Sequence, residues 1–156
     1  MSETLQRKIH MVLVHPQIPP NTGNIARTCA ATCTPLHLVG PLGFDISDKA
    51  LKRAGLDYWS YVEIYHYESC ETFLESIGAN ARLICFTKKG RVLYTDIHYQ
   101  KNDWLLFGSE TKGLPNCVLE RCYQDVFIPM SGAHVRSLNL AAAAAVGLYE
   151  AFRQVW

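Results

Sequence analysis

Short apolar runs alternate along the chain with segments in which apolar residues recur at helical spacing. The apolar runs predict strands at Ile9–His15, Leu36–Gly40, Tyr61–Tyr67, Arg82–Thr87, Trp104–Gly108 and Val126–Met130. The other segments predict helices that start at Thr22, span Ser47–Gly55, Ser69–Gly78 and Leu114–Cys122, and run from Ser137 to the C-terminal end. Because strands and helices alternate, we expect one α/β domain over residues 1–156, with a mostly parallel sheet flanked by helices.

Parallel sheets bind ligands outside the carboxyl ends of their strands, so the residues after each strand are the first place to look for a site. After the first strand comes "HPQIPPNTGNIAR", in which Pro19 and Pro20 fix an extended entry and Asn21 can cap a helix. An ordinary capped loop explains these residues equally well. Arg27 is less ordinary, because a guanidinium about one turn inside a helix opposes the helix dipole and calls for an anion nearby.

Two later strand exits are also polar and rich in glycine. "SETKGLP" follows Trp104–Gly108, and its two flanking glycines, Gly108 and Gly113, predict either a capped turn or a backbone cradle for a ligand around Glu110. "SGAHVRSLNLAAAAAVGLYEAF" follows the last strand. There Ser137 is the expected N-cap, and the alanine run predicts a thin helix that packs closely on the sheet, on a second copy of the chain, or on both.

Charge and composition narrow the classes of function. The 156 residues are 49% hydrophobic and 19% charged, which indicates a globular protein, and the net charge of +1 gives no global basic field. Binding to RNA would therefore depend on local patches or on two chains together. No apolar run reaches the roughly 18 residues of a membrane span, and "MSETLQRK" lacks the apolar core of a secretory signal. We expect a cytoplasmic protein with no membrane partner.

The chain has six cysteines, which we expect to be reduced thiols in such a compartment. Cys29 and Cys33 share a helix face, and Cys117 and Cys122 lie together in a later segment. Their spacing does not match the tighter Cys-x-x-Cys pairs of zinc sites, so no metal is expected.

The three strand exits, in this order and at these separations, resemble the motifs of the SPOUT superfamily of methyltransferases, and in particular its SpoU branch. The matching stretches are "NTGNIAR", "LLFGSETKGLP" and "IPMSGAHVRSLNLAAAAAVGLYEAFR", and the similarity extends from Ile9 to Arg153. The intervening "GFDISDKALKRAGLDYW" and "TKKG" resemble the minimal members of the branch, which methylate the ribose 2′-hydroxyl of the wobble nucleotide, C34 or U34, of tRNA.

The resemblance implies a single SPOUT domain with a deep trefoil knot near its C-terminus, and a homodimer in which Arg27 faces the partner's pocket. S-adenosylmethionine would be the methyl donor and S-adenosylhomocysteine the product. The residues that would form the reactive centre are Asn21, Arg27, Glu110 and Asn139. The residues that would hold the cofactor are Phe86, Thr87, Gly108, Ile128, Pro129, Met130, Ser137 and Leu138.

Contacts to RNA are predicted at local basic and aromatic positions. Lys49, Lys52 and Arg53 share one face of a predicted helix, and Arg136 lies in the third motif. Tyr58 and Trp59 follow and could stack on bases or belong to the core. Further basic candidates are Lys88, Lys89 and Arg91.

Arginine keeps its proton in proteins, so we expect Arg27 to act by charge, on a substrate phosphate or a developing alkoxide, rather than as a literal base. A salt-bridge partner in the structure is the alternative for this residue. For the whole chain, two other functions remain open: 2′-O-methylation of ribosomal RNA, and a non-catalytic RNA- or nucleotide-binding module on the same scaffold.

Overall fold

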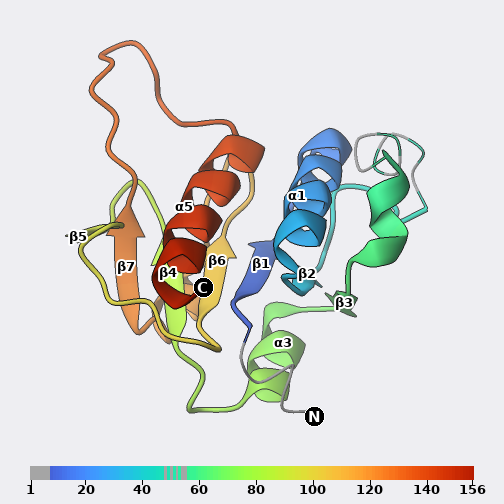
Figure 1. The fold of residues 1–156 in the computed structure, drawn as a ribbon, viewed down its shortest axis with the longest axis horizontal. Coiled ribbons are helices and arrows are strands. Elements are labelled where there is room, and N and C mark those ends of the chain that lie inside the picture. Colours follow the sequence, from blue (N-terminus) through green and yellow to red (C-terminus); the bar gives the residue numbers. More distant parts are fainter. Residues whose placement is uncertain (1–7, 48, 50, 52, 54–55) are drawn as a thin grey trace.

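The structure, a computed structural model, describes residues 8–47, 49, 51, 53 and 56–156. Its centre is a seven-stranded sheet in the order β3-β2-β1-β6-β4-β7-β5, and every neighbouring pair is parallel (Figure 1). The strands are β1 (His10–Val14), β2 (Leu36–Val39), β3 (Ile64–Tyr67), β4 (Leu83–Phe86), β5 (Val92–Leu93), β6 (Trp104–Phe107) and β7 (Gln124–Phe127). The helices are α1 (Pro19–Thr32), η2 (Leu56–Tyr61, a 3₁₀ helix), α3 (Cys70–Ile77), α4 (Asn116–Leu119) and α5 (Leu140–Val155). The expected α/β class with a parallel sheet flanked by helices is confirmed.

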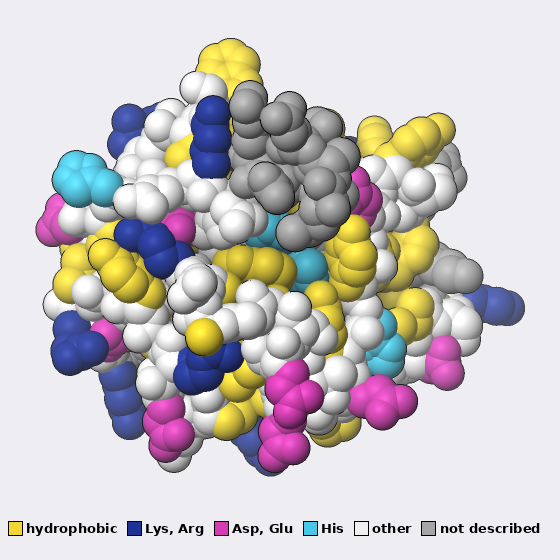
Figure 2. Space-filling view, turned by 90° about the horizontal axis from the view of Figure 1, so that it is seen from below, with side chains coloured by type: hydrophobic (Ala, Val, Ile, Leu, Met, Phe, Trp, Pro, Cys, Tyr) yellow, Lys and Arg dark blue, Asp and Glu magenta, His cyan; other side chains and the backbone are white. Residues whose placement is uncertain are grey.

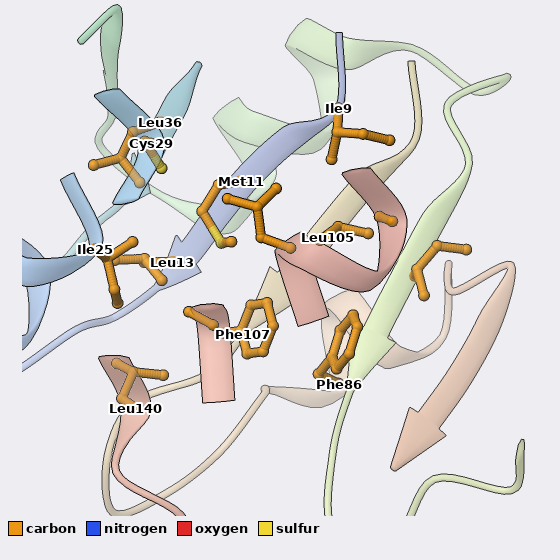
Figure 3. Packing of buried hydrophobic residues seen from close by; sticks show 14 of the residues in the cluster. Ile9, Met11, Leu13, Ile25, Cys29, Leu36, Phe86, Leu105, Phe107 and Leu140 are labelled. Atoms are coloured by element: carbon orange, nitrogen blue, oxygen red, sulfur yellow. The ribbon is translucent and has the colours of Figure 1, made fainter. Parts of the chain in front are cut away.

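The sheet is buried on both faces, which explains why its central strands are apolar throughout rather than alternating. On β1, Met11 and Leu13 point to the face covered by α1 and α5, and Val12 and Val14 point to the face covered by α3 and α4. Figure 3 shows the first of these cores, with Ile25 of α1 packed against the strands. This two-sided core fixes where each strand ends, and so where the polar strand exits lie.

Three helix predictions meet the structure differently. For α3 the prediction is confirmed: the Ser69 side chain accepts a hydrogen bond from the backbone N–H of Thr72, and Gly78 ends the helix with φ of 80°. The helix predicted over Leu114–Cys122 is only the four residues of α4. The helix predicted over Ser47–Gly55 lies largely outside the described residues.

The first and last helices begin elsewhere than predicted. Helix α1 starts at Pro19, because proline suits the first helical positions, where an N–H would be unpaired. Arg27 therefore lies more than two turns inside the helix, and the prediction that it sits about one turn from the N-terminus is wrong. Helix α5 starts at Leu140, and its N-cap is Asn139 and not Ser137, since the Asn139 side chain accepts from the N–H of Ala142.

The strand predictions are right in existence but shifted at some ends. The segment predicted as one strand over Tyr61–Tyr67 is divided between the end of η2 and β3. Strand β7 runs from Gln124 to Phe127, so Ile128–Met130 belongs to the following loop. The two-residue strand β5 was not predicted, because so short a segment has no periodicity to detect.

A buried polar chain crosses three strands on the face covered by α3. His10 Nε2 lies 2.9 Å from Asn102 Oδ1, His10 Nδ1 lies 3.0 Å from His37 Nε2, and His37 Nδ1 lies 2.9 Å from the Tyr67 hydroxyl. His10 also stacks on Trp104, with 3.8 Å between the ring centroids. Burial lowers the pKa of His37 to about 3, with a smaller contribution from His10, and burial also lowers the pKa of His10. Both imidazoles are therefore neutral near pH 7.

An ion pair closes the sheet near the start of β6. Arg82 Nε lies 2.7 Å from Asp103 Oδ1 and its Nη2 lies 3.0 Å from Oδ2, while the Asp103 side chain is only 1% exposed. The face at the amino ends of the strands, seen in Figure 2, carries basic and acidic side chains intermingled. Among the described helices, none has the length and apolar character needed to cross a membrane.

Candidate functional site

A cavity of about 450 Å³ lies outside the carboxyl ends of β4, β6 and β7. Its lining comes from the strand exits: Phe86 and Thr87 after β4, the loop after β6, the start of the β7–α5 loop, and the first residues of α5. Figure 1 shows that β7–α5 loop extending beyond the sheet before the chain returns into α5. Pockets for small molecules have volumes of roughly 300–1,000 Å³, so the cavity is large enough for a nucleoside-sized ligand.

The inner wall of the cavity is formed by two stacked rings. Phe86 and Phe107 have centroids 4.5 Å apart and an interplanar angle of 18°. Behind them lies Gly147 of α5, where an added Cβ would come within 2.7 Å of the Phe86 ring and 3.0 Å of the Phe107 ring. The missing side chain therefore lets α5 approach close enough to fix the position of both rings.

The loop from Gly108 to Gly113 forms a second wall. The N–H of Gly113 donates to the carbonyl of Ser109, and the N–H of Lys112 donates to the Ser109 hydroxyl. Gly113 has φ of 68°, which favours glycine. A Cβ on Gly108 would overlap the backbone of Gly113, so Gly108 is required by the packing of the loop itself.

Three residues predicted at the reactive centre are joined by hydrogen bonds. The Asn21 side-chain amide donates to Glu110 Oε1 over 3.4 Å, and the Asn139 side-chain amide donates to Asn21 Oδ1 over 3.1 Å. Glu110 also accepts from the backbone N–H groups of Gln17, at 2.9 Å, and Ile18, at 3.0 Å. Residues from the three motifs, far apart in sequence, therefore meet at one place beside the cavity.

Arg27, the fourth of these residues, lies apart from them. It does not line the cavity, its side chain is exposed on α1, and its guanidinium carbon lies 5.2 Å from the centre of the Tyr58 ring. Within one chain the structure therefore does not bring Arg27 to the other three residues.

Of the eight residues predicted to hold the cofactor, seven line the cavity: Phe86, Thr87, Gly108, Ile128, Met130, Ser137 and Leu138. Pro129 is exposed and is not part of the lining. Of the predicted RNA contacts, Lys49, Arg53 and Arg136 are exposed, and Lys52 lies outside the described residues.

Other lining residues were not predicted for this site. They are Phe107, Ser109, Thr111, Lys112, Leu114, Asn116, Leu119, Leu140 and Ala143, together with Lys88 and Lys89, which the sequence suggested only as RNA contacts. Lys112 could have been found from its place between the two glycines, whereas Leu140 and Ala143 look like any core residue of a helix. The three lysines suit a ligand with an anionic group. Within the described part of the chain, no cluster of three or more histidine, cysteine or acidic side chains is placed to hold a metal ion.

Residues 8–149 match the SpoU rRNA Methylase family. The chain belongs to this family. The resemblance drawn from the three motifs is thus confirmed over nearly the whole chain.

Relatives within the family are close and similar in length. A Synechocystis protein named "Putative tRNA (cytidine(34)-2'-O)-methyltransferase" is 55% identical over 148 residues, which cover 94% of this chain and 97% of that protein. A Yersinia pestis protein named tRNA (cytidine(34)-2'-O)-methyltransferase is 47% identical over 153 residues, covering 94% of each chain.

Solved structures agree in fold. One described as "Structural insights into the 2-OH methylation of C/U34 on tRNA" is 48% identical, with a TM-score of 0.89, and the match covers 95% of this chain and 91% of that one. An AdoMet-bound rRNA methyltransferase from Sinorhizobium meliloti is 28% identical, with a TM-score of 0.88, and the match covers 97% of this chain but 59% of that one.

Proposed function

We propose that this protein transfers a methyl group from S-adenosylmethionine to the ribose 2′-hydroxyl of the wobble nucleotide, C34 or U34, of tRNA. The observation that carries the proposal is identity of 47–55% over at least 93% of the chain to proteins named for this reaction. The relative named for rRNA methylation is only 28% identical, and this chain covers just 59% of its length. Ribosomal RNA is therefore the weaker candidate substrate.

The cavity suits the proposed methyl donor. S-adenosylmethionine, when bound, supplies a methyl group on a positively charged sulfur. The stacked rings of Phe86 and Phe107 and the apolar side chains of Ile128 and Leu138 would hold the adenine, and the loop from Gly108 offers backbone groups to the ribose. The lysines at the rim suit the carboxylate of the amino-acid portion.

The chain's own task is to orient and activate the ribose hydroxyl, a very weak acid. Arg27 stays protonated, so its guanidinium would bind the substrate phosphate and stabilise charge developing on the attacking oxygen. Stabilisation of developing charge by one positioned donor contributes about 3–4 kcal/mol. The position of Arg27 away from its own cavity supports a homodimer in which it serves the partner's site.

Further features support the dimer. Helix α5 presents Val146 and Tyr149, which are 39% and 48% exposed, and Trp156 at its end is 95% exposed. An apolar stripe on a helix of small residues suits close packing against a second copy. We also propose the C-terminal trefoil knot and a cytoplasmic location. The knot is supported by the insertion of β6 between β1 and β4 and by the return of the chain from β7 to α5, and an experimental structure traced through residues 82–156 tests it.

The activity is tested with labelled S-adenosylmethionine and tRNA transcripts, followed by mapping of methylated riboses. We expect methylation at nucleotide 34, and none in transcripts that carry a 2′-deoxyribose there. Methylation of ribosomal RNA but not of tRNA would replace the proposed substrate. Binding of S-adenosylhomocysteine without methylation of either RNA would favour a binding module.

The role of Arg27 has its own test. Arg27→Ala should lower the single-turnover rate at saturating RNA by roughly 100-fold or more, the factor equivalent to about 3 kcal/mol, while S-adenosylhomocysteine binding is kept. Arg27→Lys should remain poor, because an ammonium lacks the planar fork. If sites form between chains, mixing Arg27→Ala with a variant defective in the cofactor cavity should restore part of the activity. Unchanged turnover in Arg27→Ala would make this residue structural.

A further inference from the structure

Helix α1, which carries Arg27, lacks a cap of its own. Its N-cap residue is Ile18, whose side chain makes no capping hydrogen bond, and its first turn contains no acidic residue. The first N–H groups of a helix have no partner within the helix, and they are normally satisfied by a side chain at the N-cap. Prolines at 19 and 20 remove two of these donors, but the N–H groups of Gln17 and Ile18 just before the helix still need an acceptor.

The missing acceptor comes from a distant part of the chain. Glu110 places Oε2 2.9 Å from the N–H of Gln17 and Oε1 3.0 Å from the N–H of Ile18. A carboxylate at this end is also favoured by the helix dipole. Both oxygens are thus directed at the start of α1, although Glu110 belongs to the loop that forms one wall of the cavity.

The same carboxylate fixes the orientation of Asn21. Because the Asn21 amide nitrogen donates to Glu110, its Oδ1 is left to accept from the amide nitrogen of Asn139. Asn139 in turn accepts from the N–H of Ala142 and so caps α5. One run of hydrogen bonds therefore joins the start of α1, the cavity loop and the start of α5, and Asn21 is only 8% exposed within it.

We propose that Glu110, Asn21 and Asn139 form a brace that positions α1, and with it Arg27, relative to the cofactor cavity, and that Glu110 acts as the remote cap of α1 rather than as a proton acceptor in the reaction. The inference rests on the proposed methyl transfer for its kinetic readout. It assigns Glu110 and Asn21 as positioning residues, because their polar atoms are directed at each other and at backbone N–H groups.

The first experiment needs no catalytic activity. Amide hydrogen exchange of Gln17 and Ile18 is compared between the wild-type chain and Glu110→Gln, with Glu120→Gln on α4 as the matched control. Hydrogen bonds to a charged acceptor contribute roughly 1.5–3 kcal/mol, so exchange should accelerate about 10- to 150-fold in Glu110→Gln and stay unchanged in the control. Equal exchange in Glu110→Gln and the wild type would overturn the brace, whether or not the protein methylates tRNA.

The second experiment separates positioning from proton transfer by exchanging the two side chains. Glu110→Gln alone places an amide nitrogen where a carboxylate oxygen accepts, and Asn21→Asp alone places two carboxylates in contact. Each should lower the single-turnover rate about 10- to 100-fold. Combined, the new amide at 110 donates to the new carboxylate at 21, which still accepts from Asn139 and lies in the first turn of α1.

The combined variant should recover at least tenfold over the slower single variant, and the cofactor affinity should recover with it. A proton acceptor at position 110 could not be rescued in this way. Rates in the combined variant equal to the product of the two single losses would overturn the positioning role. If the wild-type chain itself transfers no methyl group to RNA, the proposed function fails while the exchange experiment still decides the brace.

Discussion

The buried chain of His10, His37 and Tyr67 makes stability depend on pH in a range where few other buried groups titrate. With Asn102 Oδ1 accepting from His10 Nε2, His10 Nδ1 must accept from His37 Nε2, and His37 Nδ1 must accept from the Tyr67 hydroxyl. Each contact then has one donor and one acceptor only while both imidazoles are neutral. A proton on either ring would place two N–H groups against each other or add an unsolvated charge.

The magnitude follows from the pKa of His37. Burial lowers it from the ordinary 6.5 to about 3, so between these values the unfolded chain binds a proton that the folded chain does not. The free energy of unfolding therefore falls as the pH falls below 6.5, by about 1.4 kcal/mol per unit. Between pH 7 and pH 5 the loss from His37 is about 2 kcal/mol, and His10 adds to it in the same direction.

The assay is urea unfolding followed by tryptophan fluorescence, at one fixed protein concentration because association would shift the apparent stability. His37→Gln removes the titrating ring, and its loss of stability between pH 7 and pH 5 should be about 2 kcal/mol smaller than that of the wild type. His134→Gln, in the exposed β7–α5 loop, is the control and should keep the wild-type pH dependence. A wild-type stability that is flat from pH 7 to pH 5, or equal slopes in the wild type and His37→Gln, would refute the reasoning.

Other predictions concern packing, an ion pair and a helix cap. Gly147→Ala should destabilise the fold by about 1–3 kcal/mol in urea unfolding and weaken S-adenosylhomocysteine binding in calorimetry, because the new methyl group displaces the Phe86 ring; a stabilised variant with normal affinity would mean that α5 can shift without cost. Arg82→Met should cost about 3 kcal/mol, since it leaves the buried Asp103 carboxylate without its cation, and adding Asp103→Asn should recover part of that loss if the buried charge is the cause. Ser69→Ala should cost about 1 kcal/mol through the lost cap of α3, a change that urea unfolding resolves, and an unchanged midpoint would mean that water replaces the cap.

The sequence predicted the strands well because each is a short, fully apolar run between polar segments, as a sheet buried on both faces requires. It misplaced the start of α1 because the cap of that helix is Glu110, some 90 residues away, and no local signal marks it. It misplaced the cap of α5 because Ser137 and Asn139 are both good caps, and only the hydrogen bond from Asn21 to its neighbour distinguishes them.

The site was predictable to a similar degree. The positions at the strand exits gather around one cavity because parallel strands end on the same side of the sheet, so motif residues such as Phe86 and Gly108 could be placed from the resemblance. Gly147 could not, since its importance depends on how closely α5 approaches the two phenylalanine rings. The separation of Arg27 from its own cavity is likewise a property of the folded chain, and the sequence could express it only through the resemblance.

The insertion of β6 between β1 and β4 has a consequence for the chain as it is made on the ribosome. Strand β1 is complete at residue 14, but the neighbour that covers one of its edges ends at residue 107. At about 5–20 residues per second, that edge waits for roughly 5–20 s with an apolar strand open to pairing with other nascent chains. We expect fragments that stop before residue 104 to aggregate during translation, and newly made chains to need a chaperone most during this interval.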